Sequence, residues 1–84
     1  MWKVFQVFPN PVSSSATVQI RLNESMDAIL TVTNLMGQTM INQNIKLNAG
    51  DNNFPVEMSD LPAGLYLLSV KSGSDIITYK VQKY

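Results

Sequence analysis

Three consecutive serines, Ser13, Ser14 and Ser15, are the first candidates for nucleophilic chemistry in this chain of 84 residues. A serine becomes a nucleophile only beside a general base, and the sequence contains neither histidine nor cysteine. The serines also stand between a proline-containing segment and an alternating run, which is the usual composition of a turn. We therefore interpret them as a turn or linker.

Six carboxylates are the other groups that could act on a substrate or hold a cation. A two-carboxylate hydrolase needs a cleft that brings two of them together, and a chain this short has little room for one. Calcium binding by Asp51 with Asn52 or Asn53 is an alternative, although the spacing differs from that of an EF-hand loop. The prediction is a protein that is not an enzyme and has no metal or cofactor. The acidic residues are Glu24, Asp27, Asp51, Glu57, Asp60 and Asp75.

The composition excludes several other classes of protein. The formal net charge is zero and no basic run is present, so the electrostatic footprint of a nucleic-acid-binding protein is missing. No apolar run approaches the roughly 18 residues of a membrane span, so membrane insertion is not expected. Residues 1–3 do not have the pattern that opens a signal peptide. The four glycines are isolated from one another, which excludes a glycine-rich phosphate loop.

Apolar and polar residues alternate with a period of two, which is typical of strands with one buried face. Residues 16–22 show this best, and residues 4–8 are expected to form an edge strand that ends at Pro9. Turn-prone segments separate seven such runs at roughly ten-residue spacing, which predicts an all-β, seven-stranded antiparallel immunoglobulin-like β-sandwich. The further runs cover residues 28–33, 41–47, 54–58, 66–70 and 77–81. The side chains expected in the core are Val18, Ile20, Leu30, Val32, Phe54, Val56, Tyr66, Leu68 and Val70.

Tyr66 follows a corner made by Pro62 and Gly64 and stands at the start of a strand. This arrangement resembles the tyrosine corner of immunoglobulin-like sandwiches, in which the hydroxyl donates to backbone upstream. We expect the ring of Tyr66 to join the core and its hydroxyl to satisfy the loop before it.

Two further patterns have alternative interpretations. Trp2, Phe5 and Phe8 form an aromatic cluster that packs on the core as part of an edge strand or, alternatively, offers a platform for a sugar. The triplet 23–25, Asn-Glu-Ser, matches the N-glycosylation pattern, and we interpret it as a turn.

Several stretches in a fixed order resemble the C-terminal sorting domain (type A) of the type IX secretion system of Bacteroidota. The first is Val7-Phe8-Pro9-Asn10-Pro11, followed by a serine-rich turn and the strand Thr17-Val18-Gln19-Ile20. The second stretch ends in a hydrophobic residue followed by Gly37 and Gln38. The third contains Leu61-Pro62-Ala63-Gly64-Leu65-Tyr66. A last strand with Lys80 completes the order, and Thr33 departs from the family at a position where it often has tyrosine.

The resemblance implies a sorting signal that directs an exported cargo protein to the cell surface. Its partners would be the type IX translocon, an outer-membrane shuttle protein, a surface sortase that removes the domain, and an upstream cargo domain. The location would be the periplasm in transit and then the outer-membrane surface or the medium. The alternative is an adhesive or carbohydrate-binding immunoglobulin-like module of a secreted protein.

The resemblance also proposes domain limits and recognition residues. Residues 1–8 would be a linker remnant and edge strand, and residues 9–84 a single sorting domain. The prolines around Asn10 would form a stiff connection to the preceding domain. Lys80 is expected to face solvent, either as one more solubilising lysine or as part of an unpaired edge that docks to the translocon. The recognition or structural motif residues are Pro9, Asn10, Pro11, Gly37, Leu61, Pro62, Gly64, Tyr66 and Lys80.

Overall fold

The computed structural model describes residues 2–84 and the side chains from Phe5 onward. All regular structure in this part of the chain is β-strand, which confirms the all-β prediction. The seven strands are β1 (Trp2–Phe8), β2 (Ser15–Leu22), β3 (Met26–Asn34), β4 (Thr39–Leu47), β5 (Gly50–Glu57), β6 (Gly64–Ser72) and β7 (Asp75–Lys83).

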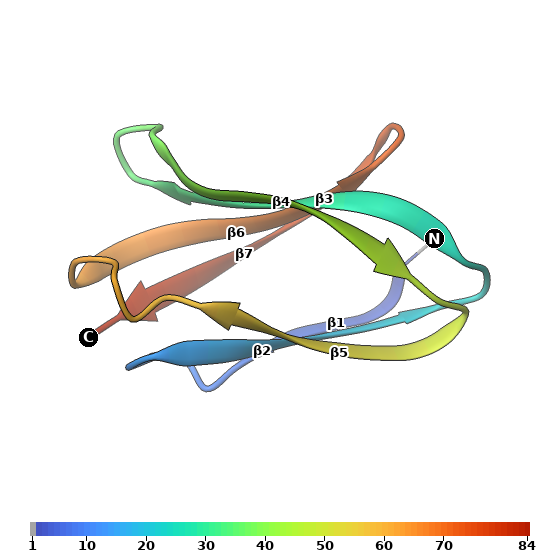
Figure 1. Cartoon of the computed structure of the whole chain (residues 1–84), viewed down its shortest axis with the longest axis horizontal. Helices are drawn as coiled ribbons and strands as arrows, with labels where there is room; N and C mark the ends of the chain where they lie inside the picture. Colours follow the sequence, from blue (N-terminus) through green and yellow to red (C-terminus); the bar gives the residue numbers. More distant parts are fainter. Residues whose placement is uncertain (1) are drawn as a thin grey trace.

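The strands form two stacked antiparallel sheets, as Figure 1 shows. One has three strands in the order β1-β2-β5, and the other has four in the order β4-β3-β6-β7. Every pair of neighbouring strands is antiparallel. The predicted sandwich of seven antiparallel strands is therefore confirmed, and its finer immunoglobulin-like classification stays a prediction.

The core lies between the sheets and is built from alternate residues of the central strands. In β2, the positions from Ala16 to Leu22 with even numbers are buried and the odd ones are not, as period two requires. Eight of the nine side chains predicted to be buried are buried, and Ile20, Leu30 and Leu68 are inaccessible to solvent. The core-facing side of these strands was thus correctly predicted from the alternation of residue types.

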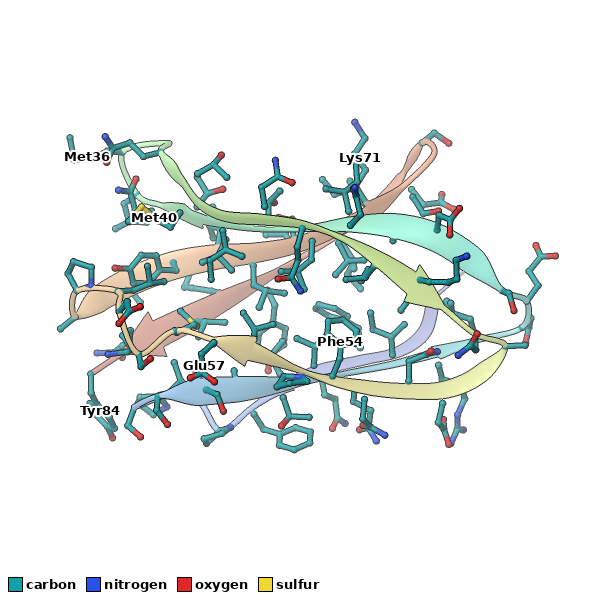
Figure 2. The ribbon with its side chains drawn as sticks, viewed as in Figure 1. Met36, Met40, Phe54, Glu57, Lys71 and Tyr84 are labelled. Carbon is teal, nitrogen blue, oxygen red and sulfur yellow. The ribbon has the colours of Figure 1, made fainter. Side chains whose placement is uncertain are left out.

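Phe54 is the exception among the predicted core residues, because it is only half-buried. It points from β5 into the space between the sheets, as Figure 2 shows. β5 is the last strand of its sheet, so one side of the ring has no neighbouring strand to cover it. Direction was correctly predicted from parity, but burial also depends on a strand's place in the sheet.

Outward-facing apolar residues also show that burial depends on the position of a side chain and not only on its residue type. Leu65 and Leu67 lie on the outer face of β6, where Leu65 is 38% exposed and Leu67 is half-buried. Phe5 and Phe8 lie on opposite faces of β1: Phe5 packs against the core, and Phe8 is 44% exposed. The prediction of one aromatic cluster is therefore wrong for Phe5 and Phe8, because an odd spacing in a strand separates them; the side chain of Trp2 lies outside the described part.

Candidate recognition surface

The segment Asn10–Val12 lies against β7, and its contacts join residues that are 70 or 72 positions apart in the chain. The side-chain Nδ2 of Asn10 donates to the carbonyl oxygen of Lys80 at 3.1 Å, and the backbone N–H of Gln82 donates to Asn10 Oδ1 at 3.0 Å. Val12 continues the contact: its N–H donates to the Gln82 carbonyl at 2.8 Å, and its own carbonyl accepts from Tyr84 N–H at 3.0 Å. We call residues Asn10–Val12 the strap.

The strap corrects two predictions. Pro9, Asn10 and Pro11 do not join this domain to a preceding one, because they connect β1 to β2, and these strands pair with each other. The last strand also lacks the open edge expected near Lys80, because the strap occupies it from Lys80 to Tyr84. The side chain of Lys80 does face solvent, as its parity opposite to Val81 predicted.

The tyrosine corner is present as predicted. Tyr66 is 4% exposed, and its hydroxyl donates to the carbonyl oxygen of Pro62 at 2.6 Å. The Leu61 N–H donates to the carbonyl of Met58, which turns the chain before the corner, and Leu61 packs against the core. Gly64 starts β6 with a φ of +155°, a conformation that favours glycine. Tyr66 lies opposite Val81 of β7, so the corner stands beside the strand that the strap holds.

Gly37 lies in the turn between β3 and β4, with a φ of +89° that a residue with a Cβ adopts only at a cost. Asn34 organises this turn, since its Oδ1 accepts from the backbone N–H groups of Met36 and Gln38. The turn presents two strongly exposed apolar side chains, Leu35 at 68% and Met36 at 85%. Figure 2 shows Met36 at the tip of the hairpin, at the same end of the molecule as Tyr84.

The structure thus brings together most of the sequence-predicted residues and leaves one apart. Asn10 contacts Lys80, and Pro62 contacts Tyr66 in the adjoining corner. Pro9 and Pro11 flank Asn10, and Leu61 and Gly64 belong to the corner, whereas Gly37 has its own hairpin. Whether these residues are recognised by another protein stays a prediction.

Three residues of this region were missed by sequence reasoning. Val12 is fully buried although it lies outside the seven strands, and Lys83 is only 7% exposed. The ammonium of Lys83 donates to the Tyr84 carbonyl oxygen at 3.0 Å. Gln82 supplies the backbone groups that the strap binds. The inward parity that Lys83 shares with Val81 was the one signal that could have indicated its burial.

The charged groups elsewhere do not form a reactive site. Arg21 and Asp51 are paired across β2 and β5, with Arg21 Nε 2.6 Å from Asp51 Oδ1. The hydrogen bond from Arg21, helped by its positive charge, lowers the pKa of Asp51 below its usual range. Asn52 is buried, and its side-chain amide forms hydrogen bonds with backbone groups of residues 20, 48 and 50. These bonds give the amide a structural role. Within residues 2–84, no group of three potential metal ligands converges.

A hollow lies on the outer face of the four-stranded sheet and contains none of the predicted motif residues. Lys46 and Lys71 line it, with Asp27 and the 43% exposed Ile29 between them. Figure 2 shows Lys71 projecting from this outer face. Among the described residues there is also no helix long and apolar enough to cross a membrane.

Comparison with protein-family models decides the identity of the chain. The model of the secretion system C-terminal sorting domain matches residues 6–83. The chain belongs to this family. It is a C-terminal sorting domain of the type IX secretion system, a non-catalytic signal that directs secretion of its cargo. Its function implies contact with the secretion machinery and a secreted or cell-surface cargo.

The fold also occurs within a larger protein. The sorting domain superimposes on part of a β-glucosidase from Kluyveromyces marxianus with a TM-score of 0.50 and 16% sequence identity. The match covers 99% of the sorting domain but only 15% of the β-glucosidase chain. At this identity the likeness shows the fold alone. A search of curated proteins found no significant match.

Proposed function

We propose that the sorting domain is read by the type IX translocon at the end of the sandwich where β7 terminates. An outer-membrane shuttle protein then receives it, and a surface sortase removes it. Cargo passes through the periplasm on this route and arrives at the outer-membrane surface or in the medium. In this scheme residues 1–8 are the linker remnant and edge strand that connect to the cargo, and residues 9–84 are the rest of the sorting domain, against which that strand pairs.

The convergence of the family motifs on β7 supports this proposal. The motif residue Asn10 binds two backbone groups of β7, and the motif residue Tyr66 lies opposite Val81 on the other side of the same strand. Lys80 stands between these contacts with its side chain in solvent. A positive charge held on a strand fixed from both sides is a well-defined feature for a partner to recognise.

A secretion reporter tests the proposal. A folded reporter with a Sec signal and residues 4–84 at its C-terminus should reach the surface of a type IX-competent cell, and the reporter without these residues should stay in the periplasm. Equal surface delivery of the two would contradict a sorting role for this domain.

A second pair of reporters tests the place of recognition. Lys80→Ala should reduce export while the domain stays folded, and Lys46→Ala is the matched control because it removes a lysine from β4, at the opposite edge of the same sheet. Equal export of the two variants would remove the Lys80 charge from the mechanism without affecting the sorting function itself. Mapping the new N-terminus of the released domain would test the division at Pro9.

A further inference from the structure

The edge of β7 would be open for pairing without the strap. β7 is the last strand of its sheet, and the backbone groups of alternate residues point away from β6. The strap contacts show which ones: the carbonyls of Lys80 and Gln82 and the N–H groups of Gln82 and Tyr84. Such a row of unpaired groups is the template on which another strand pairs.

The strap closes this edge without creating a new one. The side-chain amide of Asn10 donates one N–H to the carbonyl of Lys80 and accepts from the N–H of Gln82 at Oδ1, so it makes the two contacts that a neighbouring strand would make. Val12 makes the next two through its backbone and forms a parallel bridge with Lys83. Pro9 and Pro11 have no N–H, so they offer no donor from which a further strand could pair.

The two ends of the strap are held differently. Val12 is fully buried, whereas Asn10 is exposed and is attached to β7 only through its side-chain amide. The Asn10 end can therefore open while Val12 stays in the core. Opening would free the carbonyl of Lys80 and the N–H of Gln82, next to the outward backbone groups of Ile76 and Thr78, which have no strand on that side.

We propose that the strap is a releasable edge guard, which opens at Asn10 and keeps β7 of one copy from pairing with β7 of a second copy. The occupant of the opened edge in a solution of the pure protein is thus a second copy of this chain. Because an exposed strand edge can pair with the same edge of an identical chain, a closed edge keeps copies of the domain apart. The inference concerns the isolated chain and does not depend on the proposed route of secretion.

Hydrogen exchange of the unmodified 84-residue chain is the first test. Strap opening frees the N–H of Gln82 without separating β7 from β6, so Gln82 should exchange at least about tenfold faster than Val81, whose N–H faces β6. Equal rates for Gln82 and Val81 would mean that the strap opens only with the whole sheet, and would overturn the proposal.

Asn10→Ala is the second test. Loss of the side-chain amide should speed exchange at Gln82 roughly fivefold to tenfold, the change expected for one hydrogen bond, and should leave Val81 unchanged. The matched control is Asn34→Ala, which removes an amide that also binds backbone, in the β3–β4 turn away from β7. An unchanged Gln82 rate in Asn10→Ala, or an unfolded variant, would show that Asn10 is not a releasable guard.

Self-association is the third measurement. In sedimentation or light scattering at roughly 100 µM, a concentration at which transiently exposed strand edges associate, Asn10→Ala should form dimers while the unmodified chain and Asn34→Ala stay monomeric. A folded Asn10→Ala variant that stays monomeric would overturn the claim that the strap prevents pairing.

Discussion

Removal of the Tyr66 hydroxyl gives the sharpest test of how the sandwich is stabilised. Tyr66→Phe keeps the buried ring and deletes the donor of the 2.6 Å hydrogen bond to Pro62. A hydrogen bond of this kind contributes about 0.5–1.5 kcal/mol, and the partner carbonyl in the loop can be partly rehydrated, so the cost should fall near 1 kcal/mol. For 84 residues at roughly 2.1 cal/mol/K of unfolding entropy each, 1 kcal/mol lowers Tm by about 6 °C.

Tyr66→Ala separates the contribution of the ring from that of the hydroxyl. The ring is part of the core, and deleting an aromatic side chain from a core costs roughly 3–5 kcal/mol. Small domains have about 5–15 kcal/mol of total stability, so this variant should lie close to unfolding at ordinary temperature.

Urea melts of the two variants, followed by circular dichroism, measure both effects. The matched control is Tyr84→Phe, which removes the same hydroxyl from a residue that is 68% exposed and should change the free energy of unfolding by less than about 0.5 kcal/mol. If Tyr66→Phe were as stable as Tyr84→Phe, the hydroxyl bond would contribute nothing. If Tyr66→Ala were also close to the unmodified chain, the packing argument would be wrong.

Four other variants or conditions test separate parts of the structure. Leu30→Ala removes a fully buried side chain and should cost about 2–5 kcal/mol in a urea melt. Gly37→Ala meets no atom within 4 Å but forces a Cβ onto a φ of +89°, so calorimetry should show a loss of about 1 kcal/mol. Lys80→Ala should stay within about 0.5 kcal/mol of the unmodified chain by the same measurement. The pKa of Asp51 is lowered in the folded state, first by the hydrogen bond from Arg21. The stability that this pair contributes is therefore present above the usual aspartate pKa, and it is lost as the pH falls through the lowered pKa of folded Asp51. This acid slope should be small because both groups are exposed, and Arg21→Ala should remove it.

Alternation of residue types was enough to predict the strands and most of the core. It succeeded in β2, β3 and β6 because these strands have neighbours on both sides, so inward parity and burial coincide. It was less reliable at the sheet edges: Phe54 of β5 is half-buried, and Gln43, on the inward parity of β4, is exposed. Parity fixes the direction of a side chain, whereas burial also needs a partner that the local sequence does not specify.

The recognition region was partly accessible to sequence reasoning. The tyrosine corner was predictable because Pro62, Gly64 and Tyr66 act over five residues of chain. The strap was not, because the bond between Asn10 and Gln82 spans 72 positions and depends on how the two sheets stack. From the sequence alone, the motif around Asn10 was therefore interpreted as a connection between domains. In the folded protein it contacts β7 instead.

The direction of the strands has a mechanical consequence for cargo. Figure 1 shows β1 starting at one end of the long axis and β7 finishing at the other, and the molecule extends 35 Å along that axis. In a C-terminal sorting domain, a cargo joined ahead of β1 would lie at the far end from the terminus of β7. The sandwich would then separate such a cargo from the end of β7 by the length of the domain. With that separation, the size of the cargo would have little effect on access to the end of the sandwich where β7 terminates.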